Sequence, residues 1–262
     1  MTDQSLIIFD NRTGSAAKLS ILISVRNDKG LFTLLEILKG YKRTDFHVCI
    51  ANDLNPEPFI RDLPEPLRGV ILHHKNSATI ATKINSLIEA AHGEWLVTLE
   101  TDTLPTKDWL DDVFSIIAGP EQDAIHLGGE IYAKPLNLNN VIFRKRAEIP
   151  PHLADTYYAN DTGWFLACEK RGIPLVKHDK KALVFHDTDP LRFYMRFFLY
   201  AHDYAYLSAE YQDYRFFKRK VMVECYYLLR GIVDIPTLLF CFAFYSVKRL
   251  FRKAGATKTE QC

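Results

Sequence analysis

Two acidic residues separated by one position, Glu100 and Asp102, directly follow Leu96–Leu99, a mostly apolar run of strand length. Acids at the carboxyl end of a strand in an α/β protein lie where ligands bind, in the crevice outside the strand ends. Carboxylate oxygens are hard ligands, so this pair suits Mg²⁺ or Mn²⁺ bound together with a substrate phosphate. Short acidic motifs also occur by chance, and Asp187-Thr188-Asp189 is a second one in this chain, so the surrounding elements have to distinguish them.

Strands alternate with helices around this motif. Apolar, β-branched runs predict strands, and apolar residues at helical spacing predict helices. We predict strands at 19–25, 47–51, 70–73 and 95–99, and helices at 30–42 and 80–91. This alternation predicts an α/β fold with a mostly parallel sheet flanked by helices. Residues 1–17 have the pattern of an N-terminal leader or of an added edge strand.

The pattern changes after Pro120. We predict two short strands at 124–127 and 130–133, then a loop, a helix from Asn160 to Gly172 and a strand at 182–186. Asn160 or Asp161 can cap the start of this helix, and Gly172 can close it because glycine accepts the left-handed conformation. From Pro190 the chain becomes aromatic, helical and basic, so we expect a domain at 18–190 and a C-terminal helical extension at 191–262.

Polar residues stand at the carboxyl ends of three predicted strands, as Arg26-Asn27, Asn52-Asp53 and Glu100-Thr101-Asp102. The carboxyl ends of parallel strands meet at one edge of a sheet, and ligands of open α/β sheets bind there. We therefore expect the three clusters to form one site, and their convergence is more specific than any single cluster.

The order and spacing of these motifs resemble the family-2 glycosyltransferases, which are inverting enzymes of the GT-A fold. The resemblance extends over about residues 18–189. The matching segments are Ser20–Asn27 for the opening strand, Ile50–Asn55 for the nucleotide motif, Asn85–Trp95 for a helix-to-strand turn, and Leu99–Asp102 with the following Trp109-Leu110 for the metal motif. Asn160-Asp161 matches the segment with the catalytic aspartate, and His186 matches a metal-binding histidine. The resemblance selects Glu100-Thr101-Asp102 over the second acidic motif.

The resemblance implies a metal site and a general base. Asp102 would bind Mn²⁺ or Mg²⁺, with His186 as a further ligand, and the cation would stabilise the leaving diphosphate. The alternatives are a turn acid for Asp102 and an ordinary core or rim residue for His186. Asp161 would take the proton from the acceptor hydroxyl during inversion, although the same residue could be a plain helix cap.

The resemblance also assigns nucleotide-sugar binding to side chains at the strand ends. These are Arg26, Asn27, Asn52, Asp53, Lys83, Glu100 and Thr101. Glu100 would face the ribose, and Arg26 suits phosphate contact or base stacking. Either Asp53 or Asn52 would contact the base, unless Asp53 is a turn residue. Lys83 would reach the diphosphate or lie on a solvated helix face.

Three positions depart from the family pattern. Asn52 replaces the first Asp of the nucleotide motif, Glu100 replaces the first Asp of the metal motif, and Asn160 replaces a Glu before the catalytic Asp. These substitutions favour, as an alternative, a sugar-nucleotide-binding protein without catalysis. A nucleotidyltransferase would bring a Gly-rich phosphate loop after the first strand, whereas the segment 25–30 contains a single glycine.

Charge is unevenly distributed along this chain, which is 48% hydrophobic and carries a net charge of +1. Residues 191–253 contain 11 Lys and Arg against 5 Asp and Glu, a net charge of +6, so the rest carries −5. Aromatic and apolar residues flanked by bases are typical of an interfacial helix on anionic lipid. The alternative is a helix pair packed on the catalytic domain or on a second subunit of a homodimer.

The resemblance, together with the polar clusters at the strand ends, implies an inverting, metal-dependent glycosyltransferase. It would move a sugar from a nucleoside diphosphate sugar, with UDP favoured and GDP or dTDP possible, to a glycan or lipid-linked acceptor in cell-surface polysaccharide synthesis. The five cysteines form no Cys-x-x-Cys pair, which favours a reducing compartment. We therefore expect a cytoplasmic protein, peripheral on the inner face of a membrane, with no nucleic-acid partner. A membrane-anchored scaffold is the remaining alternative.

Overall fold

The computed structural model describes residues 5–12, 17–25, 29–52, 60–74, 78–131, 139–152 and 160–186. The strands are β1 (Ser5–Asp10), β2 (Leu19–Ser24), β3 (Phe46–Asn52), β4 (Gly69–His74), β5 (Trp95–Glu100), β6 (Thr103–Pro105), β7 (Ile125–Gly128), β8 (Glu130–Ile131), β9 (Val141–Arg144), β10 (Leu175–His178) and β11 (Val184–His186). The helices are α1 (Lys29–Lys39), α2 (Ile80–Ala90), α3 (Trp109–Ile117) and α4 (Asn160–Lys170).

The strands form two sheets. An eight-stranded sheet has the order β1-β4-β3-β2-β5-β9-β7-β10, and a three-stranded sheet has the order β6-β11-β8. In the large sheet only β1 and β9 run against their neighbours, while the other paired strands run parallel. The predicted α/β fold with a mostly parallel sheet is therefore confirmed. Of the two interpretations of residues 1–17, the structure shows an edge strand at Ser5–Asp10.

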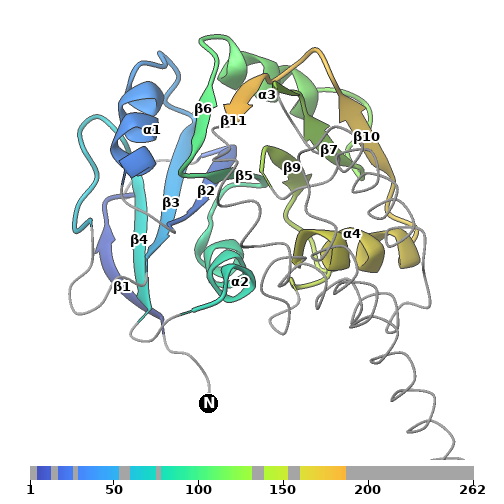
Figure 1. Cartoon of the computed structure of the whole chain (residues 1–262), viewed down its shortest axis with the longest axis horizontal. Helices are drawn as coiled ribbons and strands as arrows, with labels where there is room; N and C mark the ends of the chain where they lie inside the picture. The colour runs from blue at the N-terminus through green and yellow to red at the C-terminus, as the bar shows by residue number, and fades with distance from the viewer. Residues whose placement is uncertain are drawn as a thin grey trace, which may run out of the picture. The chain divides into compact units, whose positions relative to one another are not determined.

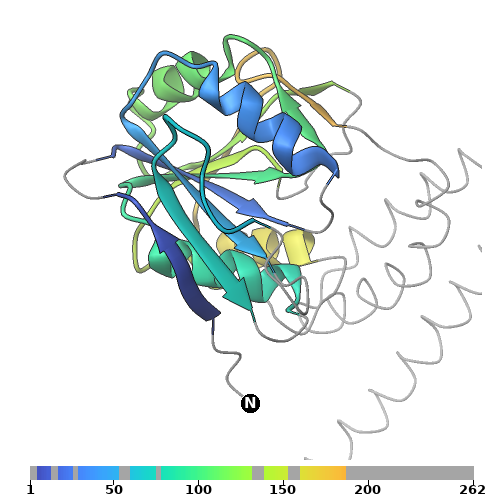
Figure 2. The same ribbon diagram turned by 90° about the vertical axis from the view of Figure 1, so that its left-hand side faces the viewer.

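The helices cover both faces of the large sheet, so the fold has three layers (Figures 1 and 2). On one face α1 and α3 bury residues such as Leu34 and Trp109 against the sheet. On the other face α2 and the part of α4 from Trp164 onward bury residues such as Leu87. Each fully buried leucine stabilises the fold by about 1.5–3 kcal/mol, which makes these two apolar cores the main source of stability.

The strand order reverses beside β2. The chain proceeds from β2 to β3 and β4 on one side, whereas β5 pairs with β2 on the other side. In an open α/β sheet such a reversal leaves a crevice at the carboxyl ends of the two strands that flank it, and ligands bind there. The fold therefore places the carboxyl ends of β2 and β5 at the position where a ligand is expected.

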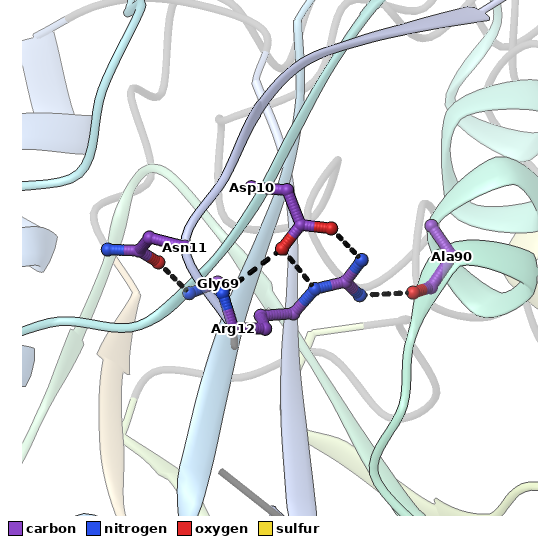
Figure 3. Close-up of polar contacts among 5 residues, drawn as sticks. All are labelled: Asp10, Asn11, Arg12, Gly69 and Ala90. Atoms are coloured by element: carbon purple, nitrogen blue, oxygen red, sulfur yellow. Dashed lines mark hydrogen bonds and ion pairs between the residues drawn. The ribbon is translucent and has the colours of Figure 1, made fainter. Parts of the chain in front are cut away.

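Arg12 follows β1 and holds the end of this strand in place, at the end of the sheet opposite to the carboxyl ends of the parallel strands (Figure 3). The buried guanidinium forms a forked pair with Asp10, at 2.8 Å from Nε and 2.5 Å from Nη2, and donates to the carbonyl of Ala90 at 2.5 Å. Ala90 ends α2, and the carbonyls at a helix C-terminus attract a cation. Beside it, Asn11 accepts a hydrogen bond from the amide of Gly69, where β4 begins, at 2.8 Å.

Contacts between Cα atoms divide the chain into two units, residues 1–154 with 164–188 and residues 155–163 with 189–262. Of the second unit, the structure describes only residues 160–163. The predicted domain at 18–190 and extension at 191–262 stay a prediction. Within the described ranges, no helix is both long enough and apolar enough to cross a membrane.

Candidate functional site

The carboxyl ends of the three central strands lie side by side. The sheet register pairs Ser24 of β2 with Ala51 of β3 on one side and with Glu100 of β5 on the other. The polar clusters that begin at Asn52 and at Glu100 therefore share one edge of the sheet, next to the end of β2. Arg26, Asn27 and Asp53 lie outside the described residues.

The turn from Glu100 to Thr103 is held tightly from two sides. Asn139 Oδ1 accepts hydrogen bonds from the Glu100 amide at 3.1 Å and from Thr103 Oγ1 at 2.8 Å, so one oxygen joins both ends of the turn. On the other side, a Cβ added at Gly30 would lie 1.6 Å from the carbonyl oxygen of Thr101. Only glycine fits at this position, where the first turn of α1 packs on the acidic motif.

Asp102 and His186 are brought together by the small sheet. β11 pairs antiparallel with β6, and the register sets His186 opposite Thr103, the residue that follows Asp102. One carboxylate and one imidazole are ligands that Mn²⁺ accepts, and they leave positions open for phosphate oxygens, so this donor set fits the predicted cation. Among the described side chains, which do not include that of His186, no group of three or more His, Cys, Asp or Glu could hold a metal ion.

Asn140 connects the region around β6 and β11 to the rest of the fold. Its Oδ1 accepts from the indole nitrogen of Trp109 at 2.9 Å, and its Nδ2 donates to the carbonyls of Ala182 at 2.7 Å and Gly129 at 3.2 Å. Its φ of 58° lies in the left-handed region, which asparagine tolerates better than most residues. Sequence patterns contain no signal for Asn139 or Asn140, because their partners Glu100, Trp109 and Ala182 lie about 30 to 40 residues away along the chain.

The described nucleotide-binding candidates point in different directions. Asn52 is buried and turns toward β4, where its Nδ2 donates to the Leu72 carbonyl at 3.4 Å and its Oδ1 lies 3.1 Å from Nδ1 of His73. Lys83 is only 3% exposed, and its ammonium donates to the carbonyl of Val25 at 2.8 Å. The interpretation of Lys83 as part of a solvated helix face is therefore wrong, since its charge lies at the carboxyl end of β2.

Asp161 lies in the first turn of α4, as predicted for an acid that opens this helix. Its carboxylate accepts a hydrogen bond from the Thr162 amide at 2.6 Å. Negative charge in the first turn of a helix is stabilised by the helix dipole, so both the capping and the catalytic interpretation remain available for this side chain. The predicted end of the helix at Gly172 is close to the observed end at Lys170, and Gly172 has a φ of 70°.

A buried histidine packs next to α4 on the large unit. The ring of His152 stacks on Trp164 at 4.6 Å, and its backbone is clamped by two hydrogen bonds with the Asn85 side chain, at 2.8 and 3.0 Å. Burial lowers the pKa of His152 to about 3. Asn85 belongs to a motif that we identified from sequence, and the structure gives it this backbone-clamping role.

Solved protein structures share this fold. The mannosyltransferase PcManGT from Pyrobaculum calidifontis, solved with GDP-Man and Mn²⁺, matches 95% of this chain and 82% of its own, with a TM-score of 0.62 and 14% identity. TarS from S. aureus, solved with UDP-GlcNAc, matches 71% of this chain and 66% of its own, with a TM-score of 0.54 and 17% identity. In another TarS structure the match spans 39% of that chain.

These similarities, at 14 to 17% identity, establish a common fold. The predicted GT-A fold, in which a mostly parallel sheet is flanked by helices, is confirmed. No protein-family model matches the chain, and no curated protein is significantly similar to it in sequence. Membership in family 2 therefore stays a prediction.

Proposed function

We propose that this protein is a glycosyltransferase that moves a sugar from a nucleoside diphosphate sugar to a hydroxyl acceptor. The observation that carries the proposal is the strand reversal between β2 and β5, with Glu100-Thr101-Asp102 at its edge and His186 opposite Thr103. Proteins of the same fold have been solved with UDP-GlcNAc and with GDP-Man and Mn²⁺, which supports a nucleotide sugar as donor. UDP sugars are the favoured donors, with GDP and dTDP sugars as alternatives.

Asp102 and His186 would hold Mn²⁺ or Mg²⁺ against the diphosphate. When bound, the cation supplies positive charge that stabilises the leaving nucleotide. Glu100 and Thr101 would contact the ribose side of the donor, and Arg26, Asn27 and Asp53 would line the nucleotide pocket. Because the Asn52 amide is already engaged with β4, we assign the contact to the base to Asp53.

Asp161 would act as the general base. Inversion requires one carboxylate to accept the proton of the acceptor hydroxyl while that oxygen attacks the anomeric carbon from the side opposite the nucleotide. The acceptor would be a glycan or a lipid-linked precursor at the inner face of a membrane, reached through residues 191–253, which lie outside the described residues.

Release of nucleoside diphosphate from UDP-, GDP- and dTDP-sugars in the presence of Mn²⁺ tests this proposal. We expect the wild-type protein to release the diphosphate from one donor class, with water or an added hydroxyl compound as acceptor. Asp161→Asn should lose this release by about 100-fold or more, as expected when a general base is removed, and should keep its affinity for the donor.

Two outcomes would contradict the proposal in different ways. Donor binding without any release by the wild-type protein would indicate a sugar-nucleotide-binding protein without catalysis. Undiminished release by Asp161→Asn would refute the assignment of the base while leaving the donor site intact.

A further inference from the structure

Asn139 and Asn140 contact both segments that carry the predicted metal ligands. We propose that these two residues are positioning residues for the divalent cation, because they fix the backbone of Asp102 relative to that of His186. This inference rests on the proposed function, in which Asp102 and His186 bind Mn²⁺ or Mg²⁺. Neither asparagine would touch the cation, and each would act through the ligand whose segment it holds.

Asn139 fixes the backbone of the segment that contains Asp102. Its Oδ1 receives hydrogen bonds from Glu100 and Thr103, the two residues that flank Thr101 and Asp102. Asn139 is 4% exposed and Thr103 is fully buried, so water cannot easily replace these bonds. Loss of this oxygen would release both ends of the turn and allow Asp102 to shift.

Asn140 fixes the backbone that leads into β11, the strand that ends at His186. Its side-chain amide donates to the carbonyl of Ala182, which precedes β11, and to the carbonyl of Gly129 between β7 and β8. A Cβ added at Gly128 would lie 2.2 Å from this Nδ2, so the chain leaves space there for the asparagine. The amide of Ala182 is held in addition by Asp112 Oδ2 at 2.8 Å, which fixes the start of β11 from α3.

Because the two asparagines are adjacent in sequence, their side-chain hydrogen bonds connect the Asp102 segment with the His186 segment through a single peptide unit. β6 and β11 pair directly over only three residue pairs, Thr103 with His186, Leu104 with Phe185 and Pro105 with Val184. Such a short ladder restrains the distance between Asp102 and His186 only weakly. A metal site, however, needs distances from ligand to metal that are correct to about 0.2 Å. Residues that orient metal ligands typically change metal affinity by about 10–100-fold when they are replaced.

Binding of Mn²⁺ alone, followed by loss of the electron paramagnetic resonance signal of the free ion, tests the inference on the full chain. We expect Asn139→Ala to weaken Mn²⁺ binding by about 10-fold or more. Thr103→Val keeps the shape of the side chain but removes the hydroxyl donor, so it should also weaken binding. Thr103→Ser keeps the hydroxyl and should bind like the wild-type protein.

Asn11→Ala is the matched control. Like Asn139, Asn11 makes two hydrogen bonds through its side chain; both are to the backbone, at Leu67 and Gly69, and they lie at the opposite end of the parallel strands. Its loss should lower the thermal stability by a similar amount and leave Mn²⁺ affinity unchanged. A general loss of stability is therefore separated from a loss of ligand position. If Asn139→Ala does not fold, the Mn²⁺ affinities of Thr103→Val and Thr103→Ser are compared instead, and equal affinities would contradict the inference.

Asp102→Asn distinguishes failure of this inference from failure of the proposed function. If Asp102→Asn weakens Mn²⁺ binding while Asn139→Ala and Thr103→Val bind as tightly as the wild-type protein, the positioning role is wrong and the metal site stands. If Asp102→Asn binds Mn²⁺ like the wild-type protein, the proposed metal site is wrong and the inference falls with it.

Discussion

At the scale of single residues, the acids of the site could be predicted from sequence and the residues that hold them could not. Glu100 and Asp102 follow a strand with an obvious apolar pattern, so their place at a strand end is a local property. Asn139 and Asn140 look like an ordinary turn in the sequence. Their importance comes from partners such as Trp109 and Ala182, which only the folded chain brings into contact.

His152 should make the stability of the protein depend on pH. Burial lowers its pKa from 6.5 to about 3, so between these values the unfolded state binds a proton that the folded state does not. The free energy of unfolding is therefore unaffected by His152 above pH 6.5 and decreases as the pH falls below it. Between pH 7 and pH 5 this one group should remove about 2 kcal/mol.

Replacement of His152 by phenylalanine tests this expectation. His152→Phe keeps an aromatic ring against Trp164 and removes the titrating group, so its stability should decrease less on acidification. Urea denaturation at pH 7 and pH 5 measures the difference. His47, His126 and His178 also have pKa values lowered by burial, so some acid sensitivity should persist. Equal losses of stability in the variant and the wild-type protein would contradict the assignment.

At the level of elements, the long apolar strands and the helices α1, α2 and α4 were predicted, and three short strands were missed. β9 has four residues and no alternation of apolar and polar side chains. β6 contains Pro105, which is tolerated because β6 is an edge strand of the small sheet. β10 lies at the edge of the large sheet and is largely exposed. Such strands are set by their neighbours in the sheet rather than by their own sequence.

The attachment of β1 should depend on Arg12. Arg12→Met keeps the length of the side chain but leaves Asp10 and the Ala90 carbonyl without the guanidinium, at a cost of about 2–3 kcal/mol. Amide hydrogen exchange should accelerate in β1 more than in β2. The matched control is Arg43→Met, because Arg43 makes a similar forked pair with Asp45 on a more exposed surface. Unchanged exchange in β1 of the Arg12 variant would show that the clamp is not needed.

At the level of the whole molecule, the fold follows from the alternation of strands and helices, whereas the membrane role that we propose for residues 191–253 rests on their charge and aromatic content. Their net charge of +6 and their aromatic content lead us to expect binding to anionic lipid vesicles and not to neutral ones. Sedimentation of the full chain with the two kinds of vesicle measures this, and binding should weaken at high salt. Equal binding to neutral vesicles would contradict an electrostatic attachment.

We expect a nucleotide sugar to bind together with a cation at the carboxyl ends of β2 and β5. Thermal unfolding of the protein with UDP, GDP, CMP or dTDP and their common sugars, each with and without Mn²⁺, is the first measurement to make. A ligand well above its dissociation constant should add about 3–4 kcal/mol of apparent stability. We predict stabilisation by one nucleotide class that requires Mn²⁺ and is lost in Asp102→Asn. No stabilisation by any nucleotide, with or without the metal, would contradict this expectation.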